Sequence, residues 1–331
     1  MQELKRIILS RTNIVCIAVL IFVNIFIFFW EFTPGNDKYT LPEYVNRYTE
    51  IMNTCRDMDN EEAINYLNNL KLQSEGIVLI PNWLNSKDIE RKEEFAEFYY
   101  KKYGEQMIND IKNGKIDISE QAANKAYADI DICNILIEKV NYLIEYPEYL
   151  NMMSENAENM KTVSIFSDPN SFSYRNIIKT VDDFSSIHIT EISLDNDLAI
   201  NALFTDSISD YSILAYMMVI VLLLIQERKK GLWPLIYAYP EGRSILAAKR
   251  VFILLICSVI ATVFLIGGRF LTAGIVYDGF GEMSRPIQSM SMFQGVSQPF
   301  TVGTFLINFF VFKIVGTWVI SLIIYMLMLA I

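Results

Sequence analysis

The chain has 331 residues, of which 52% are hydrophobic and 13% aromatic, and it carries 28 lysines and arginines against 38 aspartates and glutamates. Its net charge of -10 is unevenly distributed: residues 31–210 hold 33 of the acids and 16 of the bases, whereas the remainder is net positive. So apolar a composition with segregated charge excludes an ordinary soluble domain and favours a membrane protein with one large polar domain. Nucleic-acid binding is disfavoured, because the basic residues lie beside apolar runs and form no contiguous face of a folded domain.

The first apolar run, residues 13–30, contains no charged residue and would cross about 27 Å of hydrocarbon as a helix. A cleaved signal peptide also begins with basic residues, but its apolar part is usually shorter and ends at small residues. Here Trp30, Glu31 and Phe32 follow the run. We therefore interpret residues 1–30 as a short cytoplasmic segment and a retained first span.

Residues 31–210 are acidic and long enough for a complete domain. Their apolar periodicity is mostly that of helices, so we predict a large, mostly helical extracellular domain. Pro42 behind Thr40 is typical of a helix start, and Asp117 with Glu120 forms a candidate capping box for a later helix.

Two sets of apolar residues in this domain recur at helical spacing, and we expect both to form buried helix faces rather than a ligand site. The sets are Phe95, Phe98 and Tyr99, and Ile132, Leu136, Val140 and Leu143. After a break at residues 168–170, a shorter helix is predicted through residues 176–184.

No residue of the chain is predicted to be catalytic, cofactor-binding or metal-ligating. His188 is the single histidine, and a lone histidine without cysteines or carboxylates at ligand spacing does not build a zinc site. The acidic residues within 57–62 lack the glycine-containing loop of a calcium site, so a solvated helix start is the better interpretation. No motif of a serine hydrolase or a zinc protease is present.

The cysteines Cys55 and Cys133 are the only extracellular pair, since Cys16 and Cys257 lie in predicted spans. A disulfide between them would close a loop of about 80 residues and stabilise the domain by about 4 kcal/mol in the chain-entropy model. Two buried free thiols explain the count equally well, and the sequence leaves both alternatives open.

Three further apolar runs predict spans at residues 211–225, 251–268 and 302–331. They enclose a loop at 226–250 and another at 269–301, the second of which contains Asp278, Glu282 and Arg285. The predicted fold class is therefore mainly α: a polytopic α-helical membrane protein.

The orientation follows from lysine and arginine near the span ends, which favour the cytoplasmic side. Residues 1–12 and 226–250 both carry an excess of bases. We therefore expect a multi-pass protein of the cell membrane with a cytoplasmic N-terminus, and with residues 31–210 and 269–301 outside.

The fourth run contains Lys313, and a charge within a bilayer is costly unless it snorkels, pairs or faces water. An interfacial helix ending near Lys313 with a shorter span from Ile314, and a true intramembrane lysine, fit the sequence equally well. The chain stops inside an apolar run, so we expect a fragment of a longer protein rather than one that ends in the membrane.

The loop at 226–250 turns at Gly231, Pro234, Pro240 and Gly242 around a short apolar piece. It has room for one short amphipathic helix at the membrane surface, which would suit docking of a partner. A basic connector without a partner explains the loop equally well.

The chain resembles the permease subunits of type-2 ABC transporters. The resemblance lies in the order of an anchor, a large external domain, a second span ending in Glu-Arg-Lys-Lys-Gly, and Pro-Glu-Gly-Arg and Ala-Lys-Arg before the third span. It implies that this loop carries the coupling helix that contacts the ATPase. The residues implicated are Glu227, Gly231, Trp233, Pro240, Arg243 and Lys249. Family members usually have six spans, and only four are visible here.

A permease subunit of this type would export a peptide, drug or lipid-like cargo. The chain lacks the phosphate-binding sequence GxxxxGK[ST], so ATP hydrolysis would belong to a separate cytoplasmic ATPase and the chain itself is not expected to be an enzyme. A second permease chain and membrane lipid are the other expected partners. The alternatives are a mechanotransmission-type ABC permease, and a membrane receptor with an extracellular ligand-binding domain and no transport.

Overall fold

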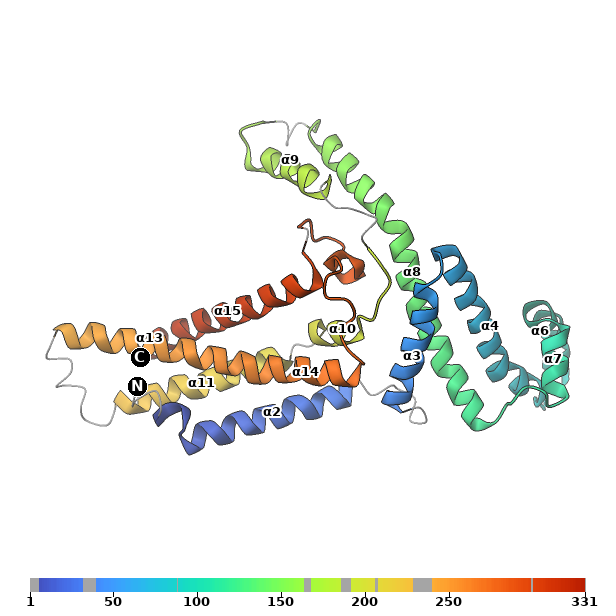
Figure 1. Ribbon diagram of the computed structural model, residues 1–331, viewed down its shortest axis with the longest axis horizontal. Coiled ribbons are helices and arrows are strands. Elements are labelled where there is room, and N and C mark those ends of the chain that lie inside the picture. The colour runs from blue at the N-terminus through green and yellow to red at the C-terminus, as the bar shows by residue number, and fades with distance from the viewer. Residues whose placement is uncertain are drawn as a thin grey trace. The chain divides into compact units, whose positions relative to one another are not determined.

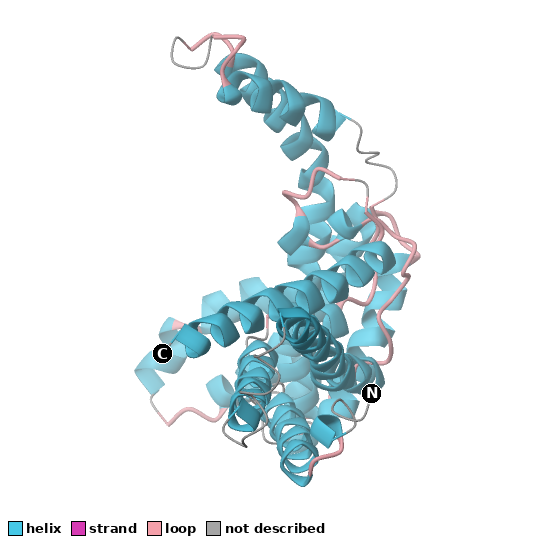
Figure 2. Cartoon of the chain, turned by 90° about the vertical axis from the view of Figure 1, so that its left-hand side faces the viewer, coloured by secondary structure: helices cyan, strands magenta, loops and turns pink. Residues whose placement is uncertain are grey.

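The computed structural model describes residues 6–31, 40–87, 89–163, 168–185, 192–205, 208–228, 240–298 and 300–330. These residues form helices and loops and contain no strand beyond one isolated bridge between Pro286 and Thr301 (Figure 2). The predicted fold class, mainly α, is confirmed. The chain divides into two compact units: unit 1 comprises Met1–Thr33, Leu198–Phe280 and Gly303–Ile331, and unit 2 comprises Pro34–Asp197 and Gly281–Val302.

Unit 1 is a bundle of long apolar helices (Figure 1). Its helices are α2 (Arg11–Glu31), α10 (Leu198–Phe204), α11 (Ile208–Arg228), α13 (Pro240–Ala261), the π-helix η2 (Thr262–Ile266), α14 (Gly267–Val276) and α15 (Val302–Ala330). By length and composition, four helical stretches could cross a membrane: Arg11–Trp30, Ile208–Gln226, Ser244–Val276 and Val302–Leu329. All four predicted spans are thus present as helices.

The long helices of unit 1 alternate in direction. Figure 1 shows α2 and the α13–α14 run pointing one way, and α11 and α15 pointing back. Contacts between helix ends agree with this arrangement: Ser209 Oγ, at the start of α11, donates to Asn24 Oδ1 near the end of α2 at 3.1 Å. An aromatic contact likewise joins the end of α2 to the end of α14, with the ring centroids of Phe28 and Tyr277 6.1 Å apart.

The third span is longer than the predicted 251–268. Ser244–Val276 contains 33 residues, which as a helix would measure about 50 Å, well beyond the roughly 30 Å of a hydrocarbon core. Its helical path widens over Thr262–Ile266, where Gly267 N–H donates to the carbonyl of Thr262, five residues earlier. Such π-turns are costly and are common where a helix serves a function.

Unit 2 is built around one long helix, α8 (Glu120–Met160). Figure 1 shows α3 and α4 along the first part of α8 and α9 along its later part. The other elements are α3 (Leu41–Arg56), α4 (Asn60–Leu84), α5 (Ile89–Glu94), α6 (Ala96–Tyr103), α7 (Glu105–Lys112), α9 (Phe172–Ser185) and the 3-10 turns η3 (Ile287–Ser289) and η4 (Ser291–Phe293).

Local sequence signals predicted where several of these helices begin. Thr40 and Glu43 form a capping box at the start of α3, with Pro42 in the first turn, as expected. The capping box predicted for Asp117 and Glu120 is wrong in detail, because Ser119 is the N-cap of α8 and its Oγ accepts from Ala122 N–H. Asp117 instead accepts from the backbone N–H of Ser119 at 2.9 Å.

The predicted buried face of α8 is confirmed. Its four residues are each at most 8% exposed: Ile132, Leu136, Val140 and Leu143. The other set of residues predicted to form a buried helix face was Phe95, Phe98 and Tyr99. That prediction is wrong for two of them, since Phe95 is 41% and Phe98 52% exposed. The chain there turns between short helices, so only Tyr99 stacks inward, on Trp83, at 4.6 Å between ring centroids.

The two units differ from the predicted segments in two places. The residues of α10 and the start of α11, which the sequence placed in the 31–210 domain, belong to unit 1. Most of the 269–301 loop, from Gly281 onward, belongs to unit 2. The extracellular domain of the sequence prediction therefore corresponds to two stretches of chain that fold together.

Candidate functional site

Four of the six predicted coupling residues lie in the two helices, α11 and α13, that flank residues 229–239, which are outside the described part of the chain. Glu227 is in the last turn of α11, and Pro240 begins α13, which also contains Arg243 and Lys249. Lys249 is exposed. Gly231 and Trp233 lie outside the described residues, so a coupling helix between the spans stays a prediction.

Arg250, next to Lys249, is instead buried at 2% exposure. Its guanidinium donates to Tyr325 Oη near the end of α15 and lies over the same ring, 5.7 Å from the centroid. Arginine and tyrosine together therefore join the middle of α13 to the end of α15. The two adjacent basic residues thus differ: Lys249 is exposed, whereas Arg250 is buried and holds two helices together.

Lys313 pairs with a carboxylate. Its Nζ lies 2.5 and 2.6 Å from the two carboxylate oxygens of Asp210, in the first turn of α11, and 5.1 Å from the ring centroid of Phe309. Position 313 is therefore level with the beginning of the second span. The helix α15 runs unbroken through Lys313, so an interfacial helix ending there is not a separate element. The 17 residues from Ile314 to Ala330 would cover about 25 Å, which suits a span that starts at the ion pair.

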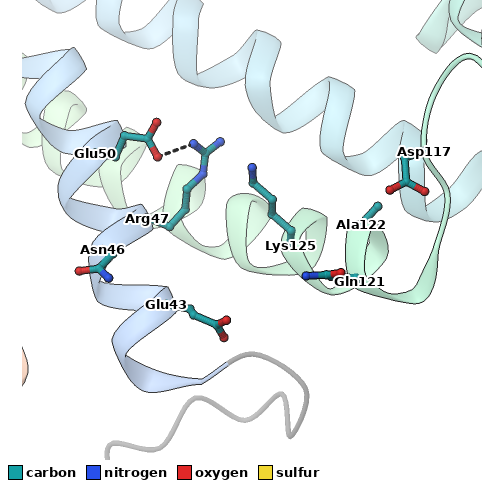
Figure 3. Close-up of a pocket in the computed structure, with 8 residues that line it drawn as sticks. All are labelled: Glu43, Asn46, Arg47, Glu50, Asp117, Gln121, Ala122 and Lys125. Carbon is teal, nitrogen blue, oxygen red and sulfur yellow. Dashed lines mark hydrogen bonds and ion pairs between the residues drawn. The ribbon is translucent and has the colours of Figure 1, made fainter.

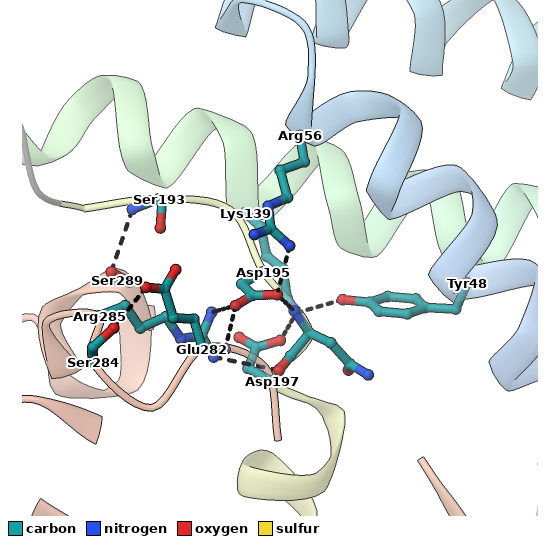
Figure 4. A network of polar contacts seen from close by, with 11 residues as sticks. Tyr48, Arg56, Lys139, Ser193, Asp195, Asp197, Glu282, Ser284, Arg285 and Ser289 are labelled. Carbon is teal, nitrogen blue, oxygen red and sulfur yellow. Dashed lines mark hydrogen bonds and ion pairs between the residues drawn. The ribbon is translucent and has the colours of Figure 1, made fainter. Parts of the chain in front are cut away.

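A network of polar contacts in unit 2 surrounds Asp195 (Figure 4). We call it the Asp195 cluster, and its members are Tyr48, Arg56, Lys139, Asp195, Asp197, Glu282 and Arg285. They come from α3, from α8, from the segment before α10 and from the segment after α14. All of these segments belong to unit 2.

The Asp195 carboxylate, whose side chain is 6% exposed, accepts hydrogen bonds from two backbone N–H groups. Its Oδ1 accepts from Asn196 at 2.8 Å and its Oδ2 from Glu282 at 2.6 Å. Two guanidinium groups stand at longer range, with Arg56 Nη1 3.6 Å and Arg285 Nη1 3.8 Å from its oxygens. Asp195 is thus held by hydrogen bonds to the backbone and by charge to two arginines.

The second half of the cluster is centred on Lys139, on α8. Its Nζ forms an ion pair with Asp197 and donates to Tyr48 Oη at 2.7 Å. Burial lowers the pKa of Lys139, although the neighbouring Asp197 acts in the opposite direction. Burial also raises the pKa of Tyr48 well above its usual range, so the phenol keeps its proton.

The cluster pairs the carboxylates of Asp195 and Asp197 with three cationic side chains, and most of these five groups are largely buried. Glu282 contributes its backbone N–H. Burying a charge costs free energy unless it is paired and hydrogen-bonded. We therefore expect the cluster to fix the geometry of these segments and to add little net stability. Asp197 directly precedes α10, and the stretch containing Arg285 lies between α14 and α15. The cluster therefore connects the segment that leads into α10 with the segment that leads into α15.

Hydrogen bonds fasten the 281–302 stretch onto the rest of unit 2 as well. Tyr142 Oη on α8 donates to the carbonyl of Gln288 at 2.6 Å, and Ser193 N–H donates to Ser289 Oγ at 3.3 Å. Within the stretch, Gln288 Nε2 donates to the carbonyls of Val296 and Gln298, both at 2.8 Å. This loop between two long helices is consequently an integral part of unit 2.

A polar cleft of about 500 Å³ lies between α3 and the start of α8 (Figure 3). Arg47, on its wall, donates two hydrogen bonds to Asp129, at 2.7 and 3.0 Å, and a third to Glu50 at 2.8 Å. These bonds raise the pKa of Arg47 and lower that of Glu50. The charges of this cleft mainly satisfy one another, so we interpret it as structural.

The structure places Cys55 on α3 and Cys133 on α8 as buried free thiols. Burial raises the pKa of Cys55 to about 11 and that of Cys133 to about 12. The sequence left open a disulfide or two free thiols, and the structure has two free thiols. Among the described residues, no group of three or more histidine, cysteine, aspartate or glutamate side chains could hold a metal ion.

Sequence reasoning missed the Asp195 cluster, although one signal was available. Lys139 lies three residues after Leu136 and four before Leu143, so it shares their buried face of α8. A lysine on a buried face requires a partner. That partner, Asp197, is 58 residues away and could not be identified from helical spacing.

Comparison of the chain with protein-family models, with curated proteins and with solved structures found no match. What is established is a mainly α-helical protein with four helices that could cross a membrane.

Proposed function

We propose that the chain is the permease subunit of an ABC transporter, driven by a separate cytoplasmic ATPase. The observation that carries the proposal is the Asp195 cluster, which fastens together two segments of unit 2 that continue into α10 and α15. A domain anchored in this way can pass a displacement to, or receive one from, the helices that cross the membrane. Such coupling is what a transporter requires if its energy source and its external domain lie on opposite sides.

The orientation belongs to the same proposal. The N-terminal segment and the 226–250 loop face the cytoplasm, and unit 2 faces outward, as the distribution of basic residues predicts. Glu227, Gly231, Trp233, Pro240, Arg243 and Lys249 would then line the surface that meets the ATPase. The exposure of Lys249 supports this role, whereas its buried neighbour Arg250 is better suited to holding α13 on α15.

The cargo we propose is a peptide, drug or lipid-like molecule that is exported, and a second permease chain would complete the pathway. Lipid would cover the apolar faces of the bundle that the chain leaves exposed. Examples on α2 are Phe22, Phe26 and Trp30, whose rings stack along the helix and are each more than half exposed.

The experiment is affinity purification of the full chain from membranes of its native cell, followed by identification of nucleotide-binding proteins. An ATPase should co-purify with the wild-type chain and be lost from the double variant Arg243→Glu, Lys249→Glu. The matched control reverses Lys71 and Lys87 of unit 2 to Glu and should retain the partner. Recovery of a monomer with no nucleotide-binding protein would overturn the proposal.

The second candidate is a mechanotransmission-type permease, in which the external domain moves as a lever and the cargo never crosses between the spans. The loop at 281–302 favours it, because unit 2 incorporates most of the connection between α14 and α15. A flux assay distinguishes the two: cargo carried across the bilayer of a proteoliposome favours the first candidate. ATP hydrolysis that depends on unit 2 without such flux favours the second. A receptor without transport would be indicated by a kinase, in place of an ATPase, among the co-purifying proteins.

A further inference from the structure

Two features that weaken a helix occur at the same place in the third span. Its path widens into the π-turn over Thr262–Ile266, and two glycines, Gly267 and Gly268, follow directly. Helices kink most readily at π-bulges and at glycine, which after proline is the poorest helix former. The third span is therefore most easily bent between residues 262 and 268.

Packing does not account for the two glycines. A Cβ at Gly267 would come no closer than 3.9 Å to the carbonyl oxygen of Thr262. A Cβ at Gly268 would meet no atom of the described residues within 4 Å beyond its own turn of helix. Alanine would fit at either position, so what the pair supplies is backbone freedom next to the π-turn.

The first half of the span, α13, is held to α15 by directional bonds. Arg250 donates to the hydroxyl of Tyr325, and Trp318 Nε1 donates to the carbonyl of Val251 at 3.1 Å. Hydrogen bonds weaken steeply when their distance or angle changes. We therefore expect α13 and α15 to keep their relative position.

The second half, α14, meets its neighbours through aromatic rings. Phe270 stacks on Phe280 with 4.0 Å between ring centroids, and it contacts Phe310 of α15 edge-on at 5.9 Å. The guanidinium of Arg269 lies 5.3 Å from the ring centroid of Phe28 on α2. Ring contacts stay favourable over centroid separations of about 4.5–7 Å, so these contacts tolerate a shift of α14.

The length of the span gives such a shift a physical reason. The 33 residues of Ser244–Val276 would measure about 50 Å as a straight helix, whereas the hydrocarbon core is about 30 Å thick. Yet α14 is apolar and exposed close to its end, where Leu271 is 64% and Ile275 83% exposed. Helices longer than the bilayer keep their apolar residues in hydrocarbon by tilting or kinking. A bend before α14 would keep these two side chains in lipid.

We propose that the third span is a hinged helix, in which α14 tilts about residues 262–268 while α13 stays fixed to α15. The tilt of α14 follows the thickness of the bilayer and is larger in a thinner one. The hinge lies wholly within unit 1, so this inference does not depend on the proposed permease function.

Dipolar electron paramagnetic resonance on the full chain in lipid nanodiscs measures this tilt. Nitroxides are attached to p-acetylphenylalanine at exposed positions, so the native cysteines stay unmodified. The test pair is Ile275 on α14 and Ile307 on α15, and the matched control pair is Phe252 on α13 and Met326 on α15.

The two pairs should behave differently when the bilayer changes. The 10 residues of α14 measure about 15 Å, so a tilt of about 20° moves the far end by about 5 Å. The test-pair distance should be broadly distributed and should shift by several ångström, about 5 Å at this tilt, between dimyristoyl and dioleoyl phosphatidylcholine. The control pair should give one narrow distribution in both lipids.

A double variant, Gly267→Ala, Gly268→Ala, tests the hinge itself. Each alanine favours a continuous helix over a bent backbone by about fivefold, so the test-pair distribution should become narrow. The matched control is Gly316→Ala, within the unbroken α15, where a Cβ also meets no described atom within 4 Å and the distribution should stay broad. The proposal is overturned if the test pair is as narrow as the control pair, if bilayer thickness does not shift it, or if the two alanines leave it unchanged.

Discussion

Asp195 shows how one side chain can hold together parts of a chain that lie far apart in sequence. Its oxygens accept from a neighbouring backbone N–H and from that of Glu282, 87 residues away. Both donors are backbone N–H groups, so the bond to position 282 does not depend on which side chain is there. It does require the backbone at 282 to stay close to Asp195, and this restricts the conformation of the preceding residue, Gly281.

Gly281 occupies a position that only glycine tolerates well. Its φ is +68°, and a Cβ there would lie 2.6 Å from the carbonyl oxygen of Asn196 and 2.8 Å from Asp195 Oδ2. We predict that Gly281→Ala lowers the free energy of unfolding of unit 2 by about 1–3 kcal/mol, because strain and backbone displacement add. The matched control is Gly114→Ala, since Gly114 has a φ of +69° with no atom within 4 Å of the added methyl. If thermal unfolding shows that the two variants lose the same amount of stability, the close contact at Gly281 is contradicted.

The buried thiols give a pH-dependent prediction. In the folded state the pKa is about 11 for Cys55 and about 12 for Cys133, against an ordinary thiol value of 9.0. The folded chain thus holds these protons more tightly than the unfolded chain. The stability of unit 2 should therefore be unaffected by these thiols at neutral pH and should fall as the pH rises above 9.

Maleimide labelling measures the same property at the two sites. At pH 8 both thiols should label slowly in the folded protein and rapidly after unfolding, because the thiolate is the reactive form. An introduced cysteine at the exposed position Asn113 serves as the control for reagent quality. Fast labelling of Cys55 or Cys133 at pH 8 would show that α3, α4 and α8 do not enclose them.

At the scale of elements, the Asp195 cluster makes the segment before α10 and the 281–302 stretch depend on each other. We predict that Asp195→Asn speeds amide hydrogen exchange severalfold in both segments, because the loss of charge releases two arginines together with one backbone bond. The control Asp131→Asn changes an exposed carboxylate that accepts from Tyr44 at 2.8 Å and should leave both segments unaffected. Faster exchange in only one segment would mean that the cluster does not couple them.

The pair of Asp210 and Lys313 gives a prediction for two helices of unit 1. Replacing either residue alone, as Asp210→Asn or Lys313→Met, should lower the melting temperature of the full chain in detergent, because the remaining charge loses its partner. The exchange of the two charges in Asp210→Lys, Lys313→Asp should recover part of the loss. If the double variant melts at or below the lower of the two single variants, the pair does not join α11 to α15.

Elements that depend on neighbouring residues were predictable from the sequence. The start of α3 at Thr40, the buried face of α8 and the four spans all follow from caps, periodicity and apolar length. Those that depend on distant contacts were not. The exposure of Phe98, the division of the chain at residue 198 and the ion pair of Lys139 are each set by packing between segments far apart in the chain.

The candidate site was predictable only in part, for the same reason. The basic loop at 226–250 is visible as a run of charge, and its flanking residues occupy helix ends in the structure. The Asp195 cluster draws one or two residues from each of four places in the chain and has no sequence motif. The partner of Lys313, Asp210, is 103 residues away in the chain and could not be predicted either.

At the scale of the whole molecule, the chain forms two compact units. Unit 1 supplies four helices that could cross a membrane, and unit 2 takes in both chain segments that lead to α10 and to α15. If nucleotide hydrolysis by a partner drives the protein, these two segments are among the four places where the chain passes between the units and can carry movement of the helices to unit 2. Covalent continuity and the Asp195 cluster make them respond together.

The most direct test is hydrogen exchange in nanodiscs, with and without ATP, on the purified complex of the full chain with the ATPase that we propose as its partner. We predict that ATP changes exchange in residues 192–197 and 281–298 of unit 2, and that Asp195→Asn abolishes the joint response while the ATPase stays bound. If the complex hydrolyses ATP but exchange in unit 2 is identical with and without ATP, the proposed coupling of unit 2 to the ATPase is contradicted.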